Sequence, residues 1–600
     1  MRCRRRATRA APARGPYAAA CACAITAVGP KYTRLLIGPR TVNDWRTVSI
    51  EYVVQLVSLF RVKAANRPLW LFLALLIAFA AVARLPSAWL AVGGRTRRRL
   101  ALGLAVLCLA WYLATIVWYV GQEQYVDYAE PTMAAVGWLF AAGRPVYHAL
   151  DSPERYAHMY GPLAFAIPGW FLAWFGPSIA VSKASGAVAG LVGLGVVYRL
   201  VCRAGARHSA LILAGLFAVL CLAFRHLSFW VRPDSFVLLF ASLGLLAAVA
   251  SRAPVAAIGL GLAAGVLVNL KLTGPLYVLP AFALVALRFG PAAFLSACVL
   301  AAVAAAVPFV VFDNVSFTNY LLWVRVSATN GLEFWTLRQN VEWALFLLVP
   351  LAPLLLAPPQ TVLPPRAFRA LLTGLALGLV GVVVAASKPG AGPYHLMPFL
   401  PVVVYILALH QARHPDASAA ADAAPSHLPP NLRATYQRGC AAFVAAASLV
   451  AVAQQTYFFQ RTRLNAGLTV ADDLERFADA HPGARIAMGA SDDDEHLTLA
   501  RPVLVFRDAR YLIDVPAIQE YQMSGLDLPP ATLRAVRDCV VDIWLIPRNG
   551  HPFETKNNYP TTGYRELFPE AFRQAFFAAY ERVGSTRLYQ VWQCRRGSSR

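Results

Sequence analysis

The sequence predicts a polytopic α-helical membrane protein of about 11 to 13 transmembrane helices, followed by a small α/β domain. Of its 600 residues, 58% are hydrophobic and only 14% are charged, and the mean hydropathy is +0.51. Apolar runs of about 20 residues recur, which is the length needed to cross a hydrocarbon core of about 30 Å. Near residue 457 these runs give way to short alternating segments. The composition therefore excludes a soluble globular protein.

The candidate spans are runs that are apolar throughout and are separated by polar or basic loops. They cover residues 69–91, 100–120, 179–201, 209–226, 235–251, 254–270, 275–289, 291–312, 341–357, 369–386, 394–411 and 439–456.

The positive charge is confined to the membrane part. The net charge is +24, but residues 457–600 hold 18 Lys+Arg and 18 Asp+Glu, so the excess lies before them. Basic residues gather in the cytoplasmic loops of membrane proteins. If the spans alternate, the basic clusters share that side; they begin at Arg95, Arg199, Arg252, Arg288, Arg366 and Arg433. This predicts a multi-pass protein of the cytoplasmic (inner) membrane, with the loop after residue 120 and the carboxyl-terminal domain extracytoplasmic, and it explains the charge without nucleic acid.

The amino-terminal arm, residues 1–67, has 13 basic and 2 acidic residues. Its charge should keep it inside, whereas a crossing at 69–91 would place it outside. Three interpretations stay open: 69–91 is a partial or interfacial helix, the arm is exported against its charge, or the true start lies downstream of Met1. No function is assigned to residues 1–60.

The carboxyl-terminal segment, residues 457–600, mixes strand-like and helix-like runs. Strands are expected at 485–490, 502–506, 540–547 and 587–594, with helices at 469–483 and 569–584. The expected organisation is thus a doubtful or disordered arm (1–67), a transmembrane domain (68–456) and an extracytoplasmic α/β domain (457–600). The Ala/Pro-rich segment 416–431 is expected to be a flexible inner connector.

The ten cysteines show no metal-ligand spacing. Cys539 and Cys594 both lie in the outer domain, where a disulfide can form, although spacing alone does not establish that they are close. The acidic run at 491–496 lacks the spaced ligands and glycine of a calcium loop, so a solvated turn is the preferred interpretation. No metal site is predicted.

The expected outer loops collect residues suited to a lipid phosphate and an acceptor. A membrane protein that transfers a group from a lipid phosphate to an acceptor needs a base to activate the acceptor, cations to bind the phosphate and apolar helices to hold the lipid tail. Asp127 and Glu130 supply carboxylates just after a span. Cations, aromatic rings and an imidazole near outer ends of spans are Arg144, Tyr160, Trp230, Arg232, Lys271, Trp323, Arg325, Lys388, Tyr394 and His395.

The order of these motifs resembles a known group. The segments "DYAEP", "GRPVYH", "YGPLAFAIPGWFLAWFGPS", "VRPDSFVLLFASLGLLA", "NLKLTGPLYVLPA" and "SKPGAGPYHLMPFLP" succeed one another over about residues 100 to 411. In this succession the chain resembles GT-C-type integral membrane glycosyltransferases around glycosyltransferase family 39, which includes protein O-mannosyltransferases and lipid A aminoarabinose transferases.

The resemblance implies a function for these residues. It implies an inverting sugar transfer on the outer face from a polyprenyl-phosphate donor, with a glycan, lipid or protein as acceptor and no cofactor or metal. Asp127 would be the base, with Glu130 second. Arg232, Lys271, Lys388 and His395 would bind the donor phosphate, and Arg144, Tyr160, Asp234, Arg325 and Tyr394 would contact substrate. Residues 460–600 would then govern acceptor specificity.

Structural roles compete with these assignments. Asp127 and Glu130 can be solvated loop residues. Arg232 and Asp234 can form a local ion pair, with Asp234 capping the next helix, and Lys271 can simply extend to the membrane interface. His395 can serve as a hydrogen-bonded interface residue, and Arg144 can fix the first loop.

Other functions also predict many spans. A lipid flippase or solute transporter should carry ionisable residues in mid-span and paired repeats, whereas the charges here lie at the expected outer ends. An envelope scaffold would need fewer spans. An O-antigen-ligase-like transferase would need a larger outer loop between late spans.

Overall fold

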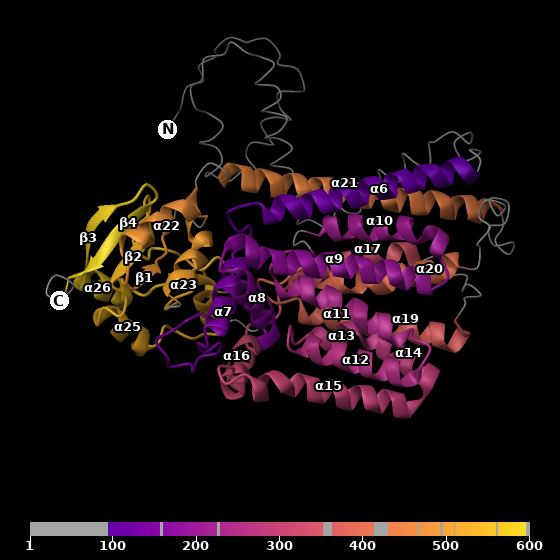
Figure 1. Cartoon of the computed structure of the whole chain (residues 1–600), viewed down its shortest axis with the longest axis horizontal. Helices are drawn as coiled ribbons and strands as arrows, with labels where there is room; N and C mark the ends of the chain where they lie inside the picture. Colours follow the sequence, from indigo (N-terminus) through magenta and orange to yellow (C-terminus); the bar gives the residue numbers. More distant parts are fainter. Residues whose placement is uncertain are drawn as a thin grey trace, which may run out of the picture. The chain divides into compact units, whose positions relative to one another are not determined.

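The computed structural model describes residues 94–156, 160–224, 228–351, 363–412, 430–465, 469–492, 496–508, 511–559 and 562–595. The arm at 1–67, the candidate span at 69–91, most of the connector at 416–431 and part of the acidic run at 491–496 lie outside these ranges. The described chain is mostly helical, with a small strand-containing domain at its carboxyl end (Figure 1). The predicted fold class is therefore confirmed.

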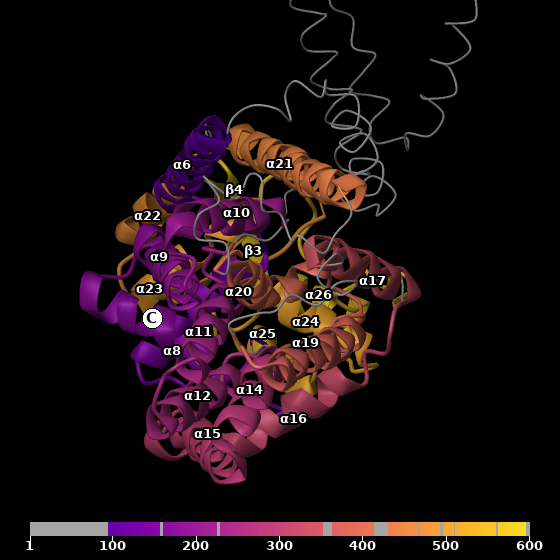
Figure 2. The ribbon, with the colours of Figure 1, turned by 90° about the vertical axis from the view of Figure 1, so that its right-hand side faces the viewer.

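Apolar helices form a bundle. Apart from 69–91, each of the expected spans overlaps a helix. By length and composition, six described helices can cross a membrane: Arg98–Val120, Ile179–Arg203, Pro291–Val311, Pro365–Ala385, Pro393–Gln411 and Ala441–Gln460. Five shorter apolar helices accompany them: Pro162–Phe175, Arg207–Ala223, Pro233–Ala248, Ala253–Val268 and Leu279–Phe289. Figure 2 shows α6 (Gly94–Val120) and α21 (Pro430–Asn465) along one side of the bundle, with α12 (Ala253–Val268) and α15 (Pro291–Val311) along another.

The other helices of the bundle complete it. They are α9 (Ile179–Arg203), α10 (Ala210–Ala223), α11 (Pro233–Ala248), α13 (Gly274–Tyr277), α14 (Leu279–Phe289), α17 (Phe334–Leu348), α19 (Pro365–Ala385) and α20 (Leu400–Gln411). The 3₁₀ turn η3 (Pro393–Phe399) leads directly into α20.

Small residues let α12 and α15 approach closely. A Cβ on Gly265 would lie 2.8 Å from the Ala301 carbonyl oxygen, so only a glycine fits at this crossing. Just beyond α12, Asn269 donates from Nδ2 to the carbonyl oxygen of Ala305 at 3.1 Å. Close backbone approach and side-chain hydrogen bonds are the usual sources of helix association in membranes.

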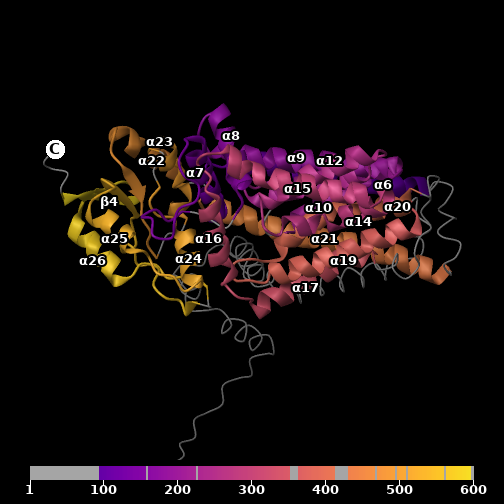
Figure 3. The ribbon, with the colours of Figure 1, turned by 90° about the horizontal axis from the view of Figure 1, so that it is seen from below.

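Short helices lie at one end of the bundle, next to the carboxyl-terminal domain. They are α7 (Ala129–Ala141), α8 (Pro162–Phe175) and α16 (Phe317–Ala328), and Figures 1 and 3 show them between the long helices and the strands. The loops that carry the candidate site residues meet at this end.

The carboxyl-terminal domain is a four-stranded sheet packed with helices. Its strands are β1 (Ile486–Met488), β2 (Ile543–Pro547), β3 (Tyr580–Ser585) and β4 (Tyr589–Cys594), in the order β1-β2-β4-β3. β1 pairs with β2 in parallel, and the other pairs are antiparallel. Its helices are α22 (Val470–Ala480), α23 (Pro502–Asp508), α24 (Val515–Met523), α25 (Pro530–Arg537) and α26 (Glu570–Ala579). The expected junction at residue 457 falls inside α21.

Two expectations for this domain were wrong. Residues 502–506 form helix α23 rather than a strand, because Pro502 starts a helix and all five side chains are buried; Phe506 packs edge-on against Trp138 of α7, 6.3 Å between ring centroids. The helix expected over 569–584 ends at Ala579. Tyr580 is fully buried and opens strand β3, which pairs with β4.

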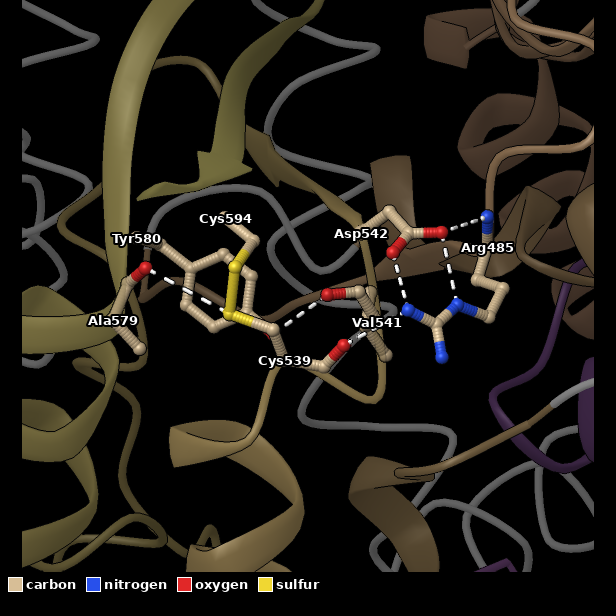
Figure 4. Close-up of a disulfide and its surroundings, with 7 residues drawn as sticks. All are labelled: Arg485, Cys539, Val541, Asp542, Ala579, Tyr580 and Cys594. Atoms are coloured by element: carbon tan, nitrogen blue, oxygen red, sulfur yellow. Dashed lines mark hydrogen bonds and ion pairs between the residues drawn. A yellow bond between two sulfur atoms is a disulfide. The ribbon is translucent and has the colours of Figure 1, made fainter. Parts of the chain in front are cut away.

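Cys539 and Cys594 form a disulfide that joins the end of α25 to the end of β4 (Figure 4). Their Cα atoms are 6.0 Å apart. Arg485 forms an ion pair with Asp542 beside the disulfide, and its Nη2 donates to the Cys539 carbonyl oxygen at 3.0 Å. The disulfide that the sequence allowed, but did not establish, is therefore formed in the structure.

Candidate active site

Four charged side chains alternate in sign in a buried chain at the domain end of the bundle. Asp127 Oδ1 accepts from Arg232 Nη1 at 2.5 Å, and Arg232 Nε lies 3.3 Å from Asp234 Oδ2. Asp234 Oδ1 in turn accepts from Lys271 Nζ at 2.5 Å. All four residues are at most 9% exposed. The local ion pair expected between Arg232 and Asp234 is therefore one link of a longer chain.

The helix ends position these four residues. Asp127 follows α6 and accepts the backbone N–H of Ala129, the first residue of α7, at 3.0 Å. Arg232 precedes Pro233 and Asp234, the first residues of α11, so the acidic side chain lies at the positive end of that helix. Lys271 lies three residues beyond the end of α12.

Tyrosine rings surround the two cations. The Arg232 guanidinium lies 5.1 Å from the centre of the Tyr394 ring, and Lys271 Nζ lies 5.4 Å from the same ring and 5.7 Å from that of Tyr160. Arg232 Nη2 also donates to the Tyr394 hydroxyl at 3.4 Å. The structure therefore brings Tyr160 and Tyr394, two of the predicted substrate-contact residues, next to the charged chain.

Lys388 and His395 approach from the segment between α19 and α20. Lys388 is half-buried and donates to the hydroxyl of Ser327 at 3.0 Å. Burial lowers the pKa of Lys388, while the negative charge of Glu520 opposes this effect. His395 stacks on Tyr394 with ring centroids 4.5 Å apart and interacts electrostatically with Lys271 and Asp234.

Burial and neighbouring charges oppose each other at the two buried cations. Burial disfavours the charge on Arg232, but Asp127, Tyr394, Tyr160 and Asp234 outweigh it and raise the pKa of the guanidinium. For Lys271, burial lowers the pKa of the ammonium group despite the attraction of Asp234. A further negative charge beside Lys271 would therefore favour its charged form.

Glu130 lies apart from this chain and is fully buried. Its Oε1 accepts the Tyr119 hydroxyl, and its Oε2 accepts the backbone N–H groups of Val126 and Asp127 at 2.8 and 3.0 Å. Burial raises the pKa of Glu130. With one oxygen bound to Tyr119 of α6 and the other to two backbone N–H groups of the loop, Glu130 holds the backbone on which Asp127 stands.

Arg144 and Arg325 are exposed, and no contact between them and the charged chain is seen in the described residues. Arg144 lies in the loop between α7 and α8, where its carbonyl oxygen accepts from Asn314 Nδ2 at 3.1 Å. Arg325 is in the last turn of α16. The structure thus separates these two cations from the other candidates.

Sequence reasoning missed Lys183 of α9, which is fully buried. Its Nζ donates to the carbonyl oxygens of Tyr119, Gln122 and Gln124 at 3.1, 2.7 and 2.6 Å. These carbonyls lie at and just beyond the end of α6, where a cation is stabilised by the helix dipole. A lysine near the start of an apolar span was the available signal.

Residues of the carboxyl-terminal domain were also missed. The Tyr559 hydroxyl lies 3.1 Å from that of Tyr128, the residue after Asp127. Glu520 of α24 interacts electrostatically with Lys388 and with Tyr559. Nothing in the sequence links these positions to their partners in the bundle, which lie more than 100 residues earlier, because the contacts depend on domain packing.

Comparison with known proteins finds no family model and no curated protein that matches the chain. Among solved structures it is similar to ArnT from Cupriavidus metallidurans bound to undecaprenyl phosphate, with a TM-score of 0.45 and 15% identity over 82% of this chain and 98% of that chain. The apo structure of the same protein gives 0.42 and 14% over the same shares.

Proposed function

We propose that this protein is a membrane glycosyltransferase that moves a sugar from a polyprenyl-phosphate donor to an acceptor hydroxyl or amine on the outer face of the membrane. The observation that carries the proposal is the buried chain Asp127, Arg232, Asp234 and Lys271, with Lys388 nearby. Buried charges of this kind are costly, and they cluster where a reaction needs them.

The cations are suited to the donor phosphate. Arg232 and Lys271 are preorganised by carboxylates, so little reorganisation is needed when a phosphate oxygen replaces one of these partners. Arg232 offers a planar fork that can bind two oxygens together. In this proposal Lys388 and His395 bind the same phosphate from the other side, and Tyr160 and Tyr394 border the sugar.

Asp127 is the proposed base. A phosphate that takes over Arg232 releases the Asp127 carboxylate and adds negative charge beside it, which makes it a better proton acceptor. The acceptor oxygen or nitrogen attacks the anomeric carbon and gives its proton to Asp127, the bond from that carbon to the phosphate oxygen breaks, and its electron pair stays on the phosphate. Attack opposite the leaving group inverts the anomeric carbon. Both oxygens of Glu130 already accept hydrogen bonds from Tyr119 and from the loop backbone, so Glu130 is the second choice as base.

The disulfide supports an extracytoplasmic position for the site. Disulfides persist in oxidising compartments and are rare in the cytosol, and Cys539 and Cys594 are bonded in the domain that packs against the Asp127 loop. We therefore place residues 457–600 outside a cytoplasmic membrane. Residues 68–456 would be the catalytic domain, and the acceptor, whether glycan, lipid or protein, would approach between the two.

The test is transfer of radiolabelled sugar in membranes loaded with a panel of polyprenyl-phosphate sugars. We expect the parent to transfer label and Asp127→Asn to lose about 10² to 10⁴-fold of the rate, which is the usual contribution of general-base catalysis. The matched control is Asp151→Asn, because Asp151 is an exposed carboxylate in the same outer loop.

The possible outcomes separate the parts of the proposal. If Asp127→Asn transfers sugar as fast as the parent at equal folded abundance, Asp127 is structural. If the parent transfers no sugar from any donor while it moves lipid or solute across sealed vesicles, the glycosyltransferase assignment is wrong and the protein is a transporter.

A further inference from the structure

The carboxyl-terminal domain holds Tyr128 at two points. Arg501 Nη2 donates to the Tyr128 carbonyl oxygen at 3.1 Å, and the hydroxyls of Tyr559 and Tyr128 lie 3.1 Å apart. Tyr128 stands directly between Asp127 and the first residue of α7. Any movement of Tyr128 therefore moves the Asp127 backbone.

A buried polar network joins the same domain to the first turn of α7. Asp514 accepts from Thr132 Oγ1 at 2.7 Å and from Arg501 Nη2 at 2.8 Å, and Arg501 Nη2 also donates to Thr132 Oγ1 at 2.8 Å. Tyr511 donates to Asp514 at 2.7 Å. Thr132 and Asp514 are fully buried and Arg501 is 7% exposed, so water does not compete for these bonds.

Tyr559 is itself fixed on both sides. Asn557 is fully buried; it accepts the backbone N–H of Tyr559 at 3.1 Å and donates to the carbonyl oxygen of Gln519 in α24 at 3.2 Å. The phenol lies against Gly390, where a Cβ would be 2.7 Å from the hydroxyl oxygen. Tyr559 thus contacts both the Asp127 loop and the loop that carries Lys388.

The membrane helices hold the opposite side of the Asp127 loop. Lys183 binds three carbonyl groups between Tyr119 and Gln124, and Glu130 accepts the backbone N–H of Asp127. The helices alone therefore fix the start of the loop, and the carboxyl-terminal domain fixes its end.

We propose that Arg501, Asp514 and Tyr559 are positioning residues that set the placement of the Asp127 carboxylate. This inference rests on the proposed function for its catalytic consequence. It assigns the carboxyl-terminal domain a part in the chemistry that does not depend on which acceptor it meets, because the three residues act on the backbone after Asp127.

The physical half of the proposal is tested by hydrogen exchange on the full-length protein in detergent. Tyr559→Phe removes one hydroxyl and leaves the ring against Gly390, and Thr132→Val removes the hydroxyl that Arg501 and Asp514 share. We expect the peptide that spans residues 124–133 to exchange at least about threefold faster in both variants, through loss of one net hydrogen bond. Two controls should exchange at the parent rate. Thr132→Ser keeps the shared hydroxyl, and Tyr564→Phe changes an exposed tyrosine of the same segment. Unaltered exchange in both variants overturns the proposal.

The catalytic half is tested by steady-state transfer with the polyprenyl-phosphate sugar that the parent uses. We expect Tyr559→Phe to lower kcat by about tenfold, as small misplacements of a catalytic group do, with the donor KM unchanged. A raised donor KM with unchanged kcat would mean that Tyr559 contacts the substrate, which overturns the positioning role. If the parent transfers no sugar, the proposed function fails, and the exchange result still decides whether these residues hold the loop.

Discussion

At the scale of single residues, the contacts among the four buried charged residues of the site explain why substitution of any one of them should destabilise the protein. Arg232 lies between two carboxylates, and Lys271 and Arg232 share Asp234. Removal of one member leaves a buried charge without its partner, which costs about 3 to 5 kcal/mol in comparable buried pairs. Loss of activity in variants of these residues therefore has to be measured at equal folded abundance.

A buried histidine that is not one of these four charged residues lies in the loop between α7 and α8. His148 is 8% exposed, its carbonyl oxygen accepts from Trp323 Nε1 at 3.0 Å, and burial lowers the pKa of its imidazole to about 4 from an ordinary 6.5. Between these values the unfolded chain binds a proton that the folded chain does not. His148 therefore costs no stability above pH 6.5. As the pH drops from 6.5 toward 4, it lowers the free energy of unfolding.

We expect His148→Gln to flatten this acid dependence. The parent should lose at most about 3 kcal/mol of unfolding free energy between pH 6.5 and 4 through this group, at about 1.36 kcal/mol for each pKa unit. Thermal unfolding of the purified protein across this range measures the difference in slope. His551→Gln, at an exposed histidine, is the control. Equal acid slopes in parent and His148→Gln would contradict the assignment.

At the scale of elements, α9 supports the segment that carries Arg232. A Cβ on Gly186 would lie 2.2 Å from the Trp230 carbonyl oxygen, which is shorter than any real contact. The same segment is tied by the Val231 N–H, which donates to the Tyr119 hydroxyl at 3.0 Å, and by Ser235, which donates to the Trp230 carbonyl oxygen at 2.6 Å. The glycine is thus required for the approach of α9 to this turn.

Two alanine substitutions in α9 should differ sharply. Gly186→Ala should shift the Trp230 backbone, lower the yield of folded protein and reduce sugar transfer. Gly195→Ala has nothing within 4 Å of its new Cβ, and alanine favours a helix by about 1 kcal/mol over glycine, so this variant should be as stable as the parent or more so. Size-exclusion profiles and melting temperatures in detergent measure both. Equal behaviour of the two variants would show that the contact is not required.

The disulfide stabilises the carboxyl-terminal domain as an element. Its 55-residue separation predicts, by the entropy of loop closure, about 4 kcal/mol of stabilisation in the oxidised chain. We expect Cys594→Ser to make the domain sensitive to limited proteolysis, and reductant to do the same to the parent. Cys298→Ser, at a free cysteine of α15, is the control. A parent that resists proteolysis equally with and without reductant would contradict this expectation.

At the scale of the whole molecule, the basic loops meet at the end of the bundle away from the strands. Arg98 donates to the carbonyl oxygen of His208 at 3.5 Å, and Arg288 donates to that of Ala248 at 2.8 Å. The opposite end carries the candidate site and the disulfide-bonded domain (Figure 1). This polarity supports one cytoplasmic and one outer end.

Labelling of introduced cysteines tests this orientation. In sealed right-side-out vesicles, a membrane-impermeant maleimide should modify Arg582→Cys, on the exposed face of β3, above the background of the parent. Arg203→Cys, in the last turn of α9, should react only after permeabilisation. The reverse pattern would place the site on the cytoplasmic side.

The sequence alone predicted that the chain lies in a membrane, that it forms a helical bundle and that a small α/β domain follows, because span length and hydropathy are local properties of about 20 residues. It also singled out Asp127, Arg232, Asp234, Lys271 and Tyr394, since charged residues near the ends of apolar runs stand out against their surroundings. It predicted the wrong state for residues 502–506, because a short buried run has no periodicity that separates strand from helix. Only the tertiary structure decided that Glu130 binds Tyr119 and the backbone before α7, that Arg144 and Arg325 lie away from the four charged residues, and that Tyr559 and Arg501 reach Tyr128. Each of these depends on contacts between segments far apart in the chain, and such contacts leave no local pattern.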